Sequence, residues 1–303
     1  MRTRIDPGRA RPTLTMMDDI CYSHVTDLEG NPLDLTLSLL TIRRPPRRPG
    51  QPEPPKAPAI VWVNGNGWRT PYPSRNMMVP ELTFLAYQGF VVASVYYRTS
   101  DQGKFPAQVI DIKTAVRFLR ANADKYGIDP ERIGVYGRSA GGHVTSFVAM
   151  NTDDFISDEW SGYSSKIQAA CDMFGPVDMT VTVRENTERV KRPDSRWHSM
   201  EETYDAKLLG WDGSVETLLE RAAVASPINY INDGMCPILI MHGEEDNSVP
   251  MRISEDFYTR IVEKGMGDRA DLYILAHAGH GSPEFYQDST REILLAFFER
   301  CLS

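Results

Sequence analysis

The sequence predicts an α/β fold in which a mostly parallel central sheet is covered by helices on both faces. From residue 59 onward, short apolar runs alternate with amphipathic segments, and such runs are typical of parallel strands buried on both sides. The alternation breaks at residue 177 and resumes after about residue 227, which predicts an insertion. The stretch "VYGRSAGG" at 135–142 joins a predicted strand to a predicted helix through a turn of small residues.

An antiparallel hairpin is expected before the alternation starts, because "DICYSHV" and "LDLTLSLLTI" flank the turn-rich "TDLEGNP". Residues 1–12 are basic and contain proline, and we expect them to be mobile. Residues 43–58, "RRPPRRPGQPEPPKAP", hold too many prolines for a helix or a central strand. They predict a flexible Pro/Arg-rich loop, with a basic docking loop as the alternative.

The α/β rhythm that follows contains six predicted strands and five predicted helices. The strands are "AIVWVNG", "FVVASVYYR", "RIGVYG", "IQAACDMFG", "PILIMHG" and "ADLYILA". The helices are expected at 76–89, 106–127, 140–150, about 250–264 and about 284–301. In the second of these, Val109, Ile112, Val116 and Leu119 fall on one face. Gly127 suits its C-terminal cap.

Length and composition favour one domain over residues 1–303, with residues 177–227 as a cap inserted into it. The formal net charge of −8 argues against nucleic acid and membrane partners. The four cysteines are far apart in the chain, which argues against a zinc site or a disulfide framework. We find no signal peptide and no apolar run that would span a bilayer, so a cytoplasmic protein is expected.

Ser139, in the turn of "VYGRSAGG", is the predicted nucleophile. A G-x-S-x-G match alone is also typical of an ordinary turn. Here, however, a strand precedes the serine and a helix follows it, which is the arrangement of a nucleophile elbow. A serine hydroxyl needs a base to take its proton and a third group to orient that base.

The partners of Ser139 should follow other strands, since functional groups of open α/β sheets gather beyond the carboxyl ends of the strands. His280 follows the last strand in "AHAGHGSPE" and is the predicted base, with His277 as the runner-up. Asp246 in "HGEEDNSVP" is the predicted orienting acid, chosen over Glu244 and Glu245 by its place before the next helix. Activity is expected to fall at acid pH, because a protonated imidazole cannot accept the serine proton.

Acyl transfer also needs hydrogen-bond donors for the oxyanion. The main-chain N–H groups of Gly65, Asn66 and Ala140 are the predicted oxyanion hole, since the first two follow a strand in "NGNGW" and the third follows the nucleophile. Trp68 and Tyr72 are candidate lining residues of an acyl pocket. Plain packing is the alternative for both aromatic residues. Arg138 is a candidate contact for a substrate carboxylate, with a surface ion pair as the alternative.

These motifs together resemble the α/β-hydrolase carboxylesterases, in particular the bifunctional feruloyl and acetyl-xylan esterase-like group close to the hormone-sensitive-lipase branch. The resemblance covers roughly residues 57–176 and 226–282 and is carried by stretches such as "WVNGNGW", "GVYGRSAGGH", "FGPVD" and "HGEEDNSVP". It implies the α/β-hydrolase fold, the triad Ser139, Asp246 and His280, and scaffold roles for Arg98 and Asp111. The family loop usually reads His-Gly-Gly-Gly-Trp, whereas this chain has asparagine at positions 64 and 66.

The resulting functional expectation is a serine esterase acting on small acyl or hydroxycinnamoyl esters, of the feruloyl or chlorogenate type, without a metal or cofactor. A serine peptidase or an arylformamidase would use the same triad. A non-catalytic binding protein on this fold and a scaffolding protein are the non-enzymatic alternatives. The expected partner is a small ester, and a homo-oligomer remains open.

Overall fold

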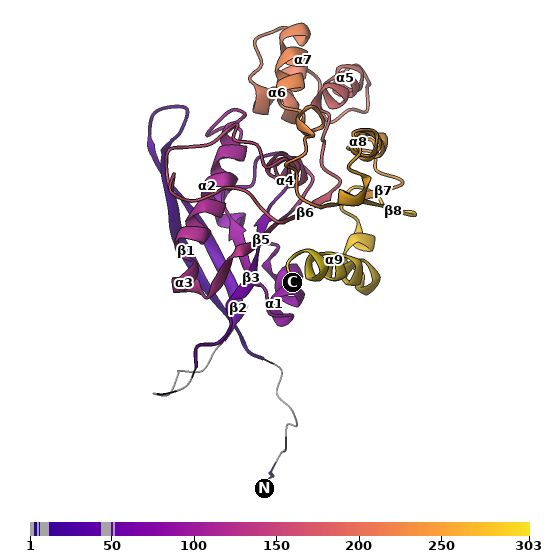
Figure 1. The fold of residues 1–303 in the computed structure, drawn as a ribbon. Helices are drawn as coiled ribbons and strands as arrows, with labels where there is room; N and C mark the ends of the chain where they lie inside the picture. The colour runs from indigo at the N-terminus through magenta and orange to yellow at the C-terminus, as the bar shows by residue number, and fades with distance from the viewer. Residues whose placement is uncertain (1–2, 5, 7–11, 44–49, 51) are drawn as a thin grey trace.

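The computed structural model describes residues 3, 4, 6, 12–43, 50 and 52–303. Within these residues, eight strands form one sheet in the order β1-β2-β4-β3-β5-β6-β7-β8 (Figure 1). They are β1 (Leu14–Thr26), β2 (Pro32–Ile42), β3 (Ala57–Val63), β4 (Val91–Val95), β5 (Ile128–Arg138), β6 (Ala169–Met173), β7 (Ile238–Gly243) and β8 (Ala270–Leu275). β1 pairs antiparallel with β2, and β2 with β4, whereas every other neighbouring pair is parallel. The predicted fold class, with its N-terminal antiparallel hairpin, is confirmed.

Nine α-helices lie in the described part of the chain. They are α1 (Val79–Tyr87), α2 (Ala107–Ala121), α3 (Ala123–Tyr126), α4 (Ala140–Ala149), α5 (Met179–Arg189), α6 (Tyr204–Leu209), α7 (Val215–Val224), α8 (Arg252–Glu263) and α9 (Asp288–Cys301). Short 3-10 helices occupy 72–74, 200–202, 227–230, 267–269 and 283–286. Within the same residues, no helix combines the length and apolar character that a bilayer crossing requires.

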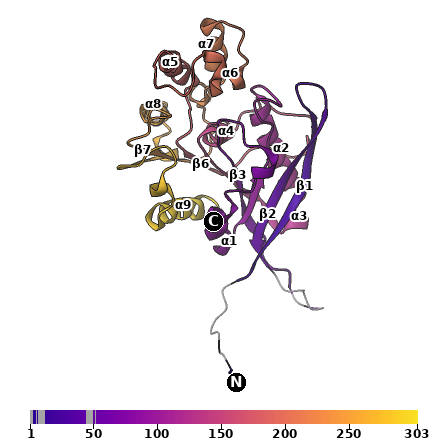
Figure 2. The ribbon, with the colours of Figure 1, turned by 180° about the vertical axis from the view of Figure 1, so that it is seen from behind.

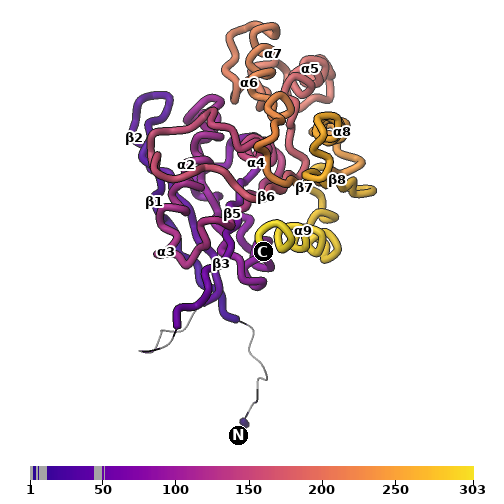
Figure 3. The backbone as a smooth tube through the Cα atoms, in the orientation of Figure 1, coloured from indigo at the N-terminus to yellow at the C-terminus, as the bar shows by residue number. Residues whose placement is uncertain are grey.

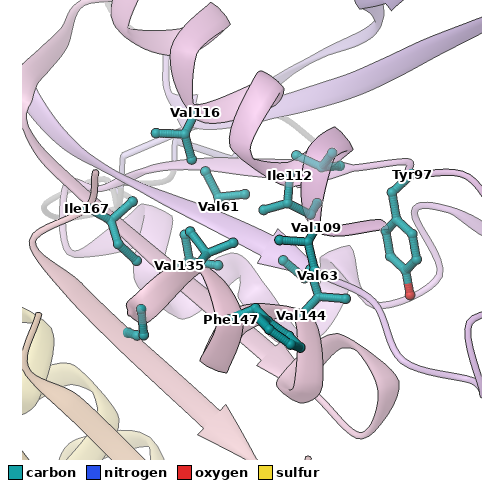
Figure 4. Close-up of a cluster of buried hydrophobic side chains, with 14 of the residues drawn as sticks. Val61, Val63, Tyr97, Val109, Ile112, Val116, Val135, Val144, Phe147 and Ile167 are labelled. Atoms are coloured by element: carbon teal, nitrogen blue, oxygen red, sulfur yellow. The ribbon is translucent and has the colours of Figure 1, made fainter. Parts of the chain in front are cut away.

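Helices cover both faces of the sheet. Successive side chains of a strand point to opposite faces, and on β3 the side chains of both faces are buried. On β3, Ile60 and Trp62 belong to a core shared with α1 and α9. Val61 and Val63 face the opposite side, where they meet apolar side chains of α2 and α4 (Figure 4). The sheet is therefore the middle layer of three, and its strand ends are free to carry polar side chains.

Two helix predictions needed correction. The helix expected at 76–89 begins only at Val79, and the residues just before it form turns. The single helix expected at 106–127 is two helices, because Asn122 leaves the helical region with φ −108° and ψ 19°. Gly127 ends the second of them with φ +66°, as a glycine cap does.

The proline-rich stretch is described only in part. β3 begins at Ala57, so the last two residues of the predicted 43–58 loop belong to the strand. Residues 44–49 and 51 lie outside the described residues, as do 1–2, 5 and 7–11 of the N-terminal stretch that the sequence predicts to be mobile. The prediction of flexibility in these two stretches therefore stays a prediction.

The residues between β6 and β7 do not continue the strand and helix alternation. They contain α5, α6 and α7, which gather at one end of the molecule in both ribbon views (Figures 1 and 2). The tube view shows the same three helices above α4 and α8, at the end opposite the N-terminus (Figure 3). The loops that carry the predicted site residues follow β3, β5, β7 and β8, whose carboxyl ends share one edge because the strands are parallel.

Candidate active site

Ser139 lies on a sharp turn between β5 and α4. Its φ of 52° and ψ of −124° place a non-glycine residue in a strained conformation. The turn is possible because small residues surround it. A Cβ on Gly137 would lie 2.3 Å from the carbonyl oxygen of Gly141, and one on Gly141 would lie 2.1 Å from that of Val63. The strand, turn and helix that the sequence predicts around the serine are therefore present.

His280 and Asp246 meet Ser139 from two other loops at the same edge. The Oγ of Ser139 lies 2.8 Å from Nε2 of His280, and Nδ1 of His280 lies 2.6 Å from Oδ2 of Asp246. An ionised carboxylate only accepts hydrogen bonds, so Nδ1 carries the proton and Nε2 is free to accept from the serine hydroxyl. This alignment is the geometry of a serine, histidine and aspartate triad.

The carboxylate of Asp246 is fully enclosed and has a donor on each oxygen. Oδ1 accepts from the main-chain N–H groups of Ser248 at 2.8 Å and Val249 at 2.9 Å. Burial by itself would raise the pKa of Asp246, but the hydrogen bonds from His242 and His280 hold that pKa well below its ordinary value. The acid is thus ionised whenever His280 can act as a base.

His242 is a buried partner of the acid that sequence reasoning missed. Its Nε2 lies 3.0 Å from the carbonyl oxygen of Val249 and 3.3 Å from Oδ2 of Asp246. A carbonyl can only accept, so Nε2 carries the proton, and Nδ1 accepts from the Ser254 hydroxyl at 2.7 Å. The only sequence signal was its place at the end of a strand, four residues before the acid.

The runner-up base, His277, and a further histidine, His143, are held by other partners. His277 is exposed, and its Nδ1 is 3.5 Å from Oε1 of Glu245. Its main-chain N–H points to the carboxylate of Glu244 at 3.4 Å. His143 is buried, and its Nε2 lies 2.8 Å from the carbonyl oxygen of Ala225. Burial lowers the pKa of His143 to about 4, so this histidine is neutral and packs in the core.

The oxyanion prediction is corrected at one position. The N–H of Gly65 donates to Oδ1 of Asn64 at 3.0 Å, and Gly65 does not line the cavity beside Ser139. Glycine is needed at 65 for close packing, since a Cβ there would lie 2.6 Å from the carbonyl oxygen of Arg138. Asn66, Gly67 and Ala140 do line this cavity, and Gly67 was not among the predicted donors.

Asn66 and Gly67 have positive φ angles of 72° and 61°, which turn the loop after β3 toward the nucleophile. Asparagine tolerates this region better than most residues, and glycine enters it freely. A Cβ on Gly67 would lie 2.6 Å from the ring of Tyr204, which belongs to α6. The loop and the 177–227 segment are therefore in direct contact.

The three predicted substrate contacts have different outcomes. Trp68 lines the cavity, and its buried ring packs edge-on against His143. Tyr72 lies away from it: its hydroxyl donates to Asp19, and its ring packs against Tyr96 at 5.0 Å. The prediction for Tyr72 is therefore wrong, because the hydroxyl is held by the edge strand β1.

Arg138 also lines the cavity, but its guanidinium is already engaged. Nη1 donates to the Tyr286 hydroxyl at 2.5 Å. The surface acid that the sequence suggested as its partner does not appear among the ion pairs of the described residues. The partner of Arg138 is instead Tyr286, from the 3-10 helix at 283–286.

The cavity has a volume of about 460 Å³ and reaches from Ser139 into the 177–227 segment. The residues of that segment on its wall are Thr182, Asn186, Arg189, Arg196, Trp197, Tyr204 and Asp205. Arg189 links α5 to the loop after β7 that carries Asp246, because its guanidinium donates to the carbonyl oxygens of Ser248 at 2.9 Å and Asn247 at 2.8 Å. The wall is thus joined to the loop that carries Asp246.

One group of described side chains could hold a metal ion. Cys21, His24 and Asp34 offer ligand atoms within 4.8 Å of one another, on the β1 and β2 hairpin. None of the three lines the cavity beside Ser139.

Comparison with known proteins adds a family and several relatives. The family model described as BD-FAE matches residues 48–261. Esterase LipQ of Mycobacterium tuberculosis is 28% identical over 224 residues, which are 74% of this chain and 49% of that protein. Esterase LipC of the same organism is 29% identical over 238 residues, 78% of this chain and 55% of that protein. The chain spans about half the length of these curated relatives.

Solved structures resemble the chain over nearly its whole length. A truncated form of a carbohydrate esterase from gut microbiota has a TM-score of 0.75 at 24% identity, covering 97% of this chain and 98% of that one. Esterase Est2 of Thermogutta terrifontis with propionate bound has a TM-score of 0.67 at 24% identity, covering 96% and 94%. At this level of identity, the likeness supports the same α/β-hydrolase fold.

Proposed function

Because this chain belongs to the BD-FAE family of the α/β-hydrolase fold, we propose that it hydrolyses carboxylic esters through an acyl-enzyme. Ser139 is the nucleophile, His280 the general base and Asp246 the orienting acid. The observation that carries the proposal is the unbroken line from Ser139 Oγ to His280 Nε2 at 2.8 Å and from His280 Nδ1 to Asp246 Oδ2 at 2.6 Å. That line supplies the base and the orienting group that a serine nucleophile needs.

The reaction begins when the hydroxyl oxygen of Ser139 attacks the ester carbonyl carbon and its proton passes to Nε2 of His280. The negative charge that develops on the carbonyl oxygen is stabilised by the N–H groups of Ala140, Asn66 and Gly67. The alcohol then leaves with the proton from His280, and the acyl group stays on the serine. Water, deprotonated by the same imidazole, attacks the acyl carbon and releases the acid.

The proposed substrates are small acyl esters and hydroxycinnamoyl esters of the feruloyl or chlorogenate type. A cavity of about 460 Å³ has room for a drug-sized ligand. Trp68 offers a buried aromatic surface on its wall. We take residues 177–227 as the cap of a single 1–303 domain, since its side chains form one wall of this cavity.

The test is a panel of p-nitrophenyl acyl esters, methyl ferulate, chlorogenic acid and acetylated xylan. Wild-type protein is expected to hydrolyse at least one class, and Ser139→Ala should lose about 10³-fold or more in kcat. Ser157→Ala is the matched control, because that serine lies outside the cavity and hydrogen bonds to Thr114. Activity that survives Ser139→Ala would contradict the proposal.

A serine peptidase or an arylformamidase would use the same three side chains. Peptide p-nitroanilides and an N-formyl aromatic amine therefore belong in the panel. If kcat/KM for an amide exceeds that for every ester, the amide-cleaving alternative replaces the esterase.

A further inference from the structure

The stretch "FGPVD" at 174–178 has no role in the mechanism above. It directly follows β6, which ends at Met173, so it begins at the same edge of the sheet as the loops that carry the proposed triad. Phe174 and Pro176 line the cavity beside Ser139. The aromatic residue at the start of this stretch therefore lies where it can act on the site.

The backbone of Phe174 is in a conformation that its residue type disfavours. Its φ is 46°, and a bulky side chain at positive φ is a genuine outlier. Its main-chain N–H donates to the carbonyl oxygen of Met241 at 2.8 Å, which ties it to β7. In the described part of the chain, nine non-glycine residues have positive φ, and four of them line this cavity: Asn66, Trp68, Ser139 and Phe174. Strain of this kind gathers at functional sites.

The ring of Phe174 packs edge-on against the imidazole of His280. The two ring centroids are 4.7 Å apart, and the ring planes meet at 64°. Among the described residues, no second aromatic ring contacts this imidazole. The far end of the Phe174 ring reaches the next residue of the loop, since a Cβ on Gly281 would lie 3.3 Å from Cζ of Phe174. The ring thus lies along two consecutive residues of the loop after β8.

Phe285 supports the ring of Phe174 in this position. Its ring centroid lies 4.6 Å from that of Phe174, again edge-on, with the planes at 69°. Both phenylalanines are almost fully buried, at 1% and 2% exposure. Aromatic pairs attract each other in this arrangement. The imidazole of His280 therefore rests against a ring that cannot easily move away.

The catalytic hydrogen bonds alone leave His280 some freedom. They hold its two ring nitrogens, at 2.8 Å from Ser139 Oγ and 2.6 Å from Asp246 Oδ2. The side chain is still 23% exposed, so the ring has solvent on one side into which it can tilt. A packed ring on another side restricts that tilt. Restriction matters for the rate, because a misplacement of about 1 Å can cost about 10²-fold.

We propose that Phe174 is a positioning residue, whose ring holds the imidazole of His280 in the orientation that takes the proton of Ser139. The inference rests on the proposed esterase function and adds a residue to its machinery. Phe174 transfers no proton itself and acts through His280. Since His280 serves in both acylation and deacylation, loss of the Phe174 ring should lower kcat for every ester by a similar factor.

The variants are Phe174→Leu, which keeps an apolar side chain without a ring, and Phe174→Met, an unbranched side chain that serves if the leucine variant does not fold. Each should lower kcat for p-nitrophenyl acetate and p-nitrophenyl butyrate by at least about tenfold. KM should stay within about threefold, because the ring acts on His280 rather than on the ester.

Phe298→Leu is the matched control. Phe298 is fully buried, packs against Tyr136 and Phe297, and does not line the cavity. The same exchange at this position removes a core ring without touching His280. It should lower the melting temperature to a similar extent and leave kcat within about twofold.

Proton NMR gives a readout that packing alone would not move. The proton on Nδ1 of His280, held against Asp246, should give a downfield resonance in the wild-type protein that His280→Ala removes. In Phe174→Leu this resonance should broaden or disappear, because a tilting ring exchanges the proton with water. Phe298→Leu should keep it.

A folded Phe174 variant with kcat within about threefold of wild type would overturn the positioning role and leave the esterase standing. A raised KM at unchanged kcat would also overturn it, since Phe174 would then contact substrate instead. An equal loss of kcat in Phe298→Leu would assign the effect to general destabilisation and refute the inference. If wild-type protein hydrolyses no ester at all, the proposed function itself fails.

Discussion

Replacing Asp246 by asparagine tests the triad through the tautomer of His280. Oδ1 of the acid accepts two main-chain N–H groups, from Ser248 and Val249. An asparagine must keep its carbonyl oxygen at that position, because an amide nitrogen there would face two donors. Its Nδ2 then occupies the place of Oδ2 and points at Nδ1 of His280.

An NH₂ group facing Nδ1 forces that nitrogen to accept, so the ring proton moves to Nε2. Nε2 then donates toward Ser139 and can no longer take the serine proton. A wrong tautomer of this kind lowers kcat by about 10⁴-fold in serine hydrolases, or about 5.4 kcal/mol at 1.36 kcal/mol per decade. His242 adds to the mismatch, since its protonated Nε2 lies 3.3 Å from the same Oδ2 position.

The assay is kcat for p-nitrophenyl acetate at pH 7.5, with melting temperatures to verify folding. Glu245→Gln is the matched control, because it removes an exposed carboxylate from the same turn and should leave kcat within about twofold. A folded Asp246→Asn variant that keeps more than a tenth of wild-type kcat would refute the tautomer reasoning. A parallel loss in Glu245→Gln would point to the turn rather than to the acid.

Three further predictions concern the scaffold around the site. Gly67→Ala adds a Cβ 2.6 Å from the Tyr204 ring at a backbone φ of 61°. This substitution should lower kcat/KM, and it should lower the free energy of unfolding by about 1–3 kcal/mol. Adding Tyr204→Ala should recover part of the activity, and no recovery would show that the ring is not the obstacle. Arg98→Gln leaves the buried carboxylate of Asp111, 2.6 Å from the guanidinium, without its charge partner and should cost about 3 kcal/mol in urea unfolding. A loss below about 1 kcal/mol would contradict this. Burial raises the pKa of Asp205 from 3.8 to about 6, so the folded state binds this proton more tightly than the unfolded state. The free energy of unfolding should therefore fall as the pH rises from about 4 to 6, by up to about 3 kcal/mol. Asp205→Asn should flatten that part of the melting-temperature profile, and an unchanged slope would show that another group titrates there.

The layered fold could be predicted because burial dictates composition. Strands covered on both faces read as runs such as "AIVWV", and helices between them keep one apolar face. Helix ends were predicted less well, since a local feature sets each of them. At Asn122 the chain leaves the helical region, and no apolar periodicity marks that position.

The three side chains of the proposed triad could also be predicted, because parallel strands bring their carboxyl ends to one edge. The sequence could not predict which residues of the proposed oxyanion loop turn their main-chain N–H groups toward the cavity. Which N–H faces the cavity depends on the Asn64 side chain, whose Oδ1 takes the N–H of Gly65. His242 was missed because a histidine at a strand end has the same sequence signal whether it packs in the core or supports an acid.

The proposed cap, residues 177–227, is the part of the chain least predictable from the sequence, and it contacts both the proposed oxyanion loop and the loop that carries Asp246. Tyr204 lies against Gly67 of the oxyanion loop, so the position of α6 limits how that loop turns. Arg189 of α5 donates to the carbonyl oxygens of Asn247 and Ser248, directly after Asp246. The same two helices carry Asn186 and Asp205, a hydrogen-bonded pair on the cavity wall. We therefore predict that α5 and α6 couple substrate preference to the geometry of the proposed triad. Exchanging residues 177–227 for the corresponding segment of a related esterase should then change kcat as well as substrate preference.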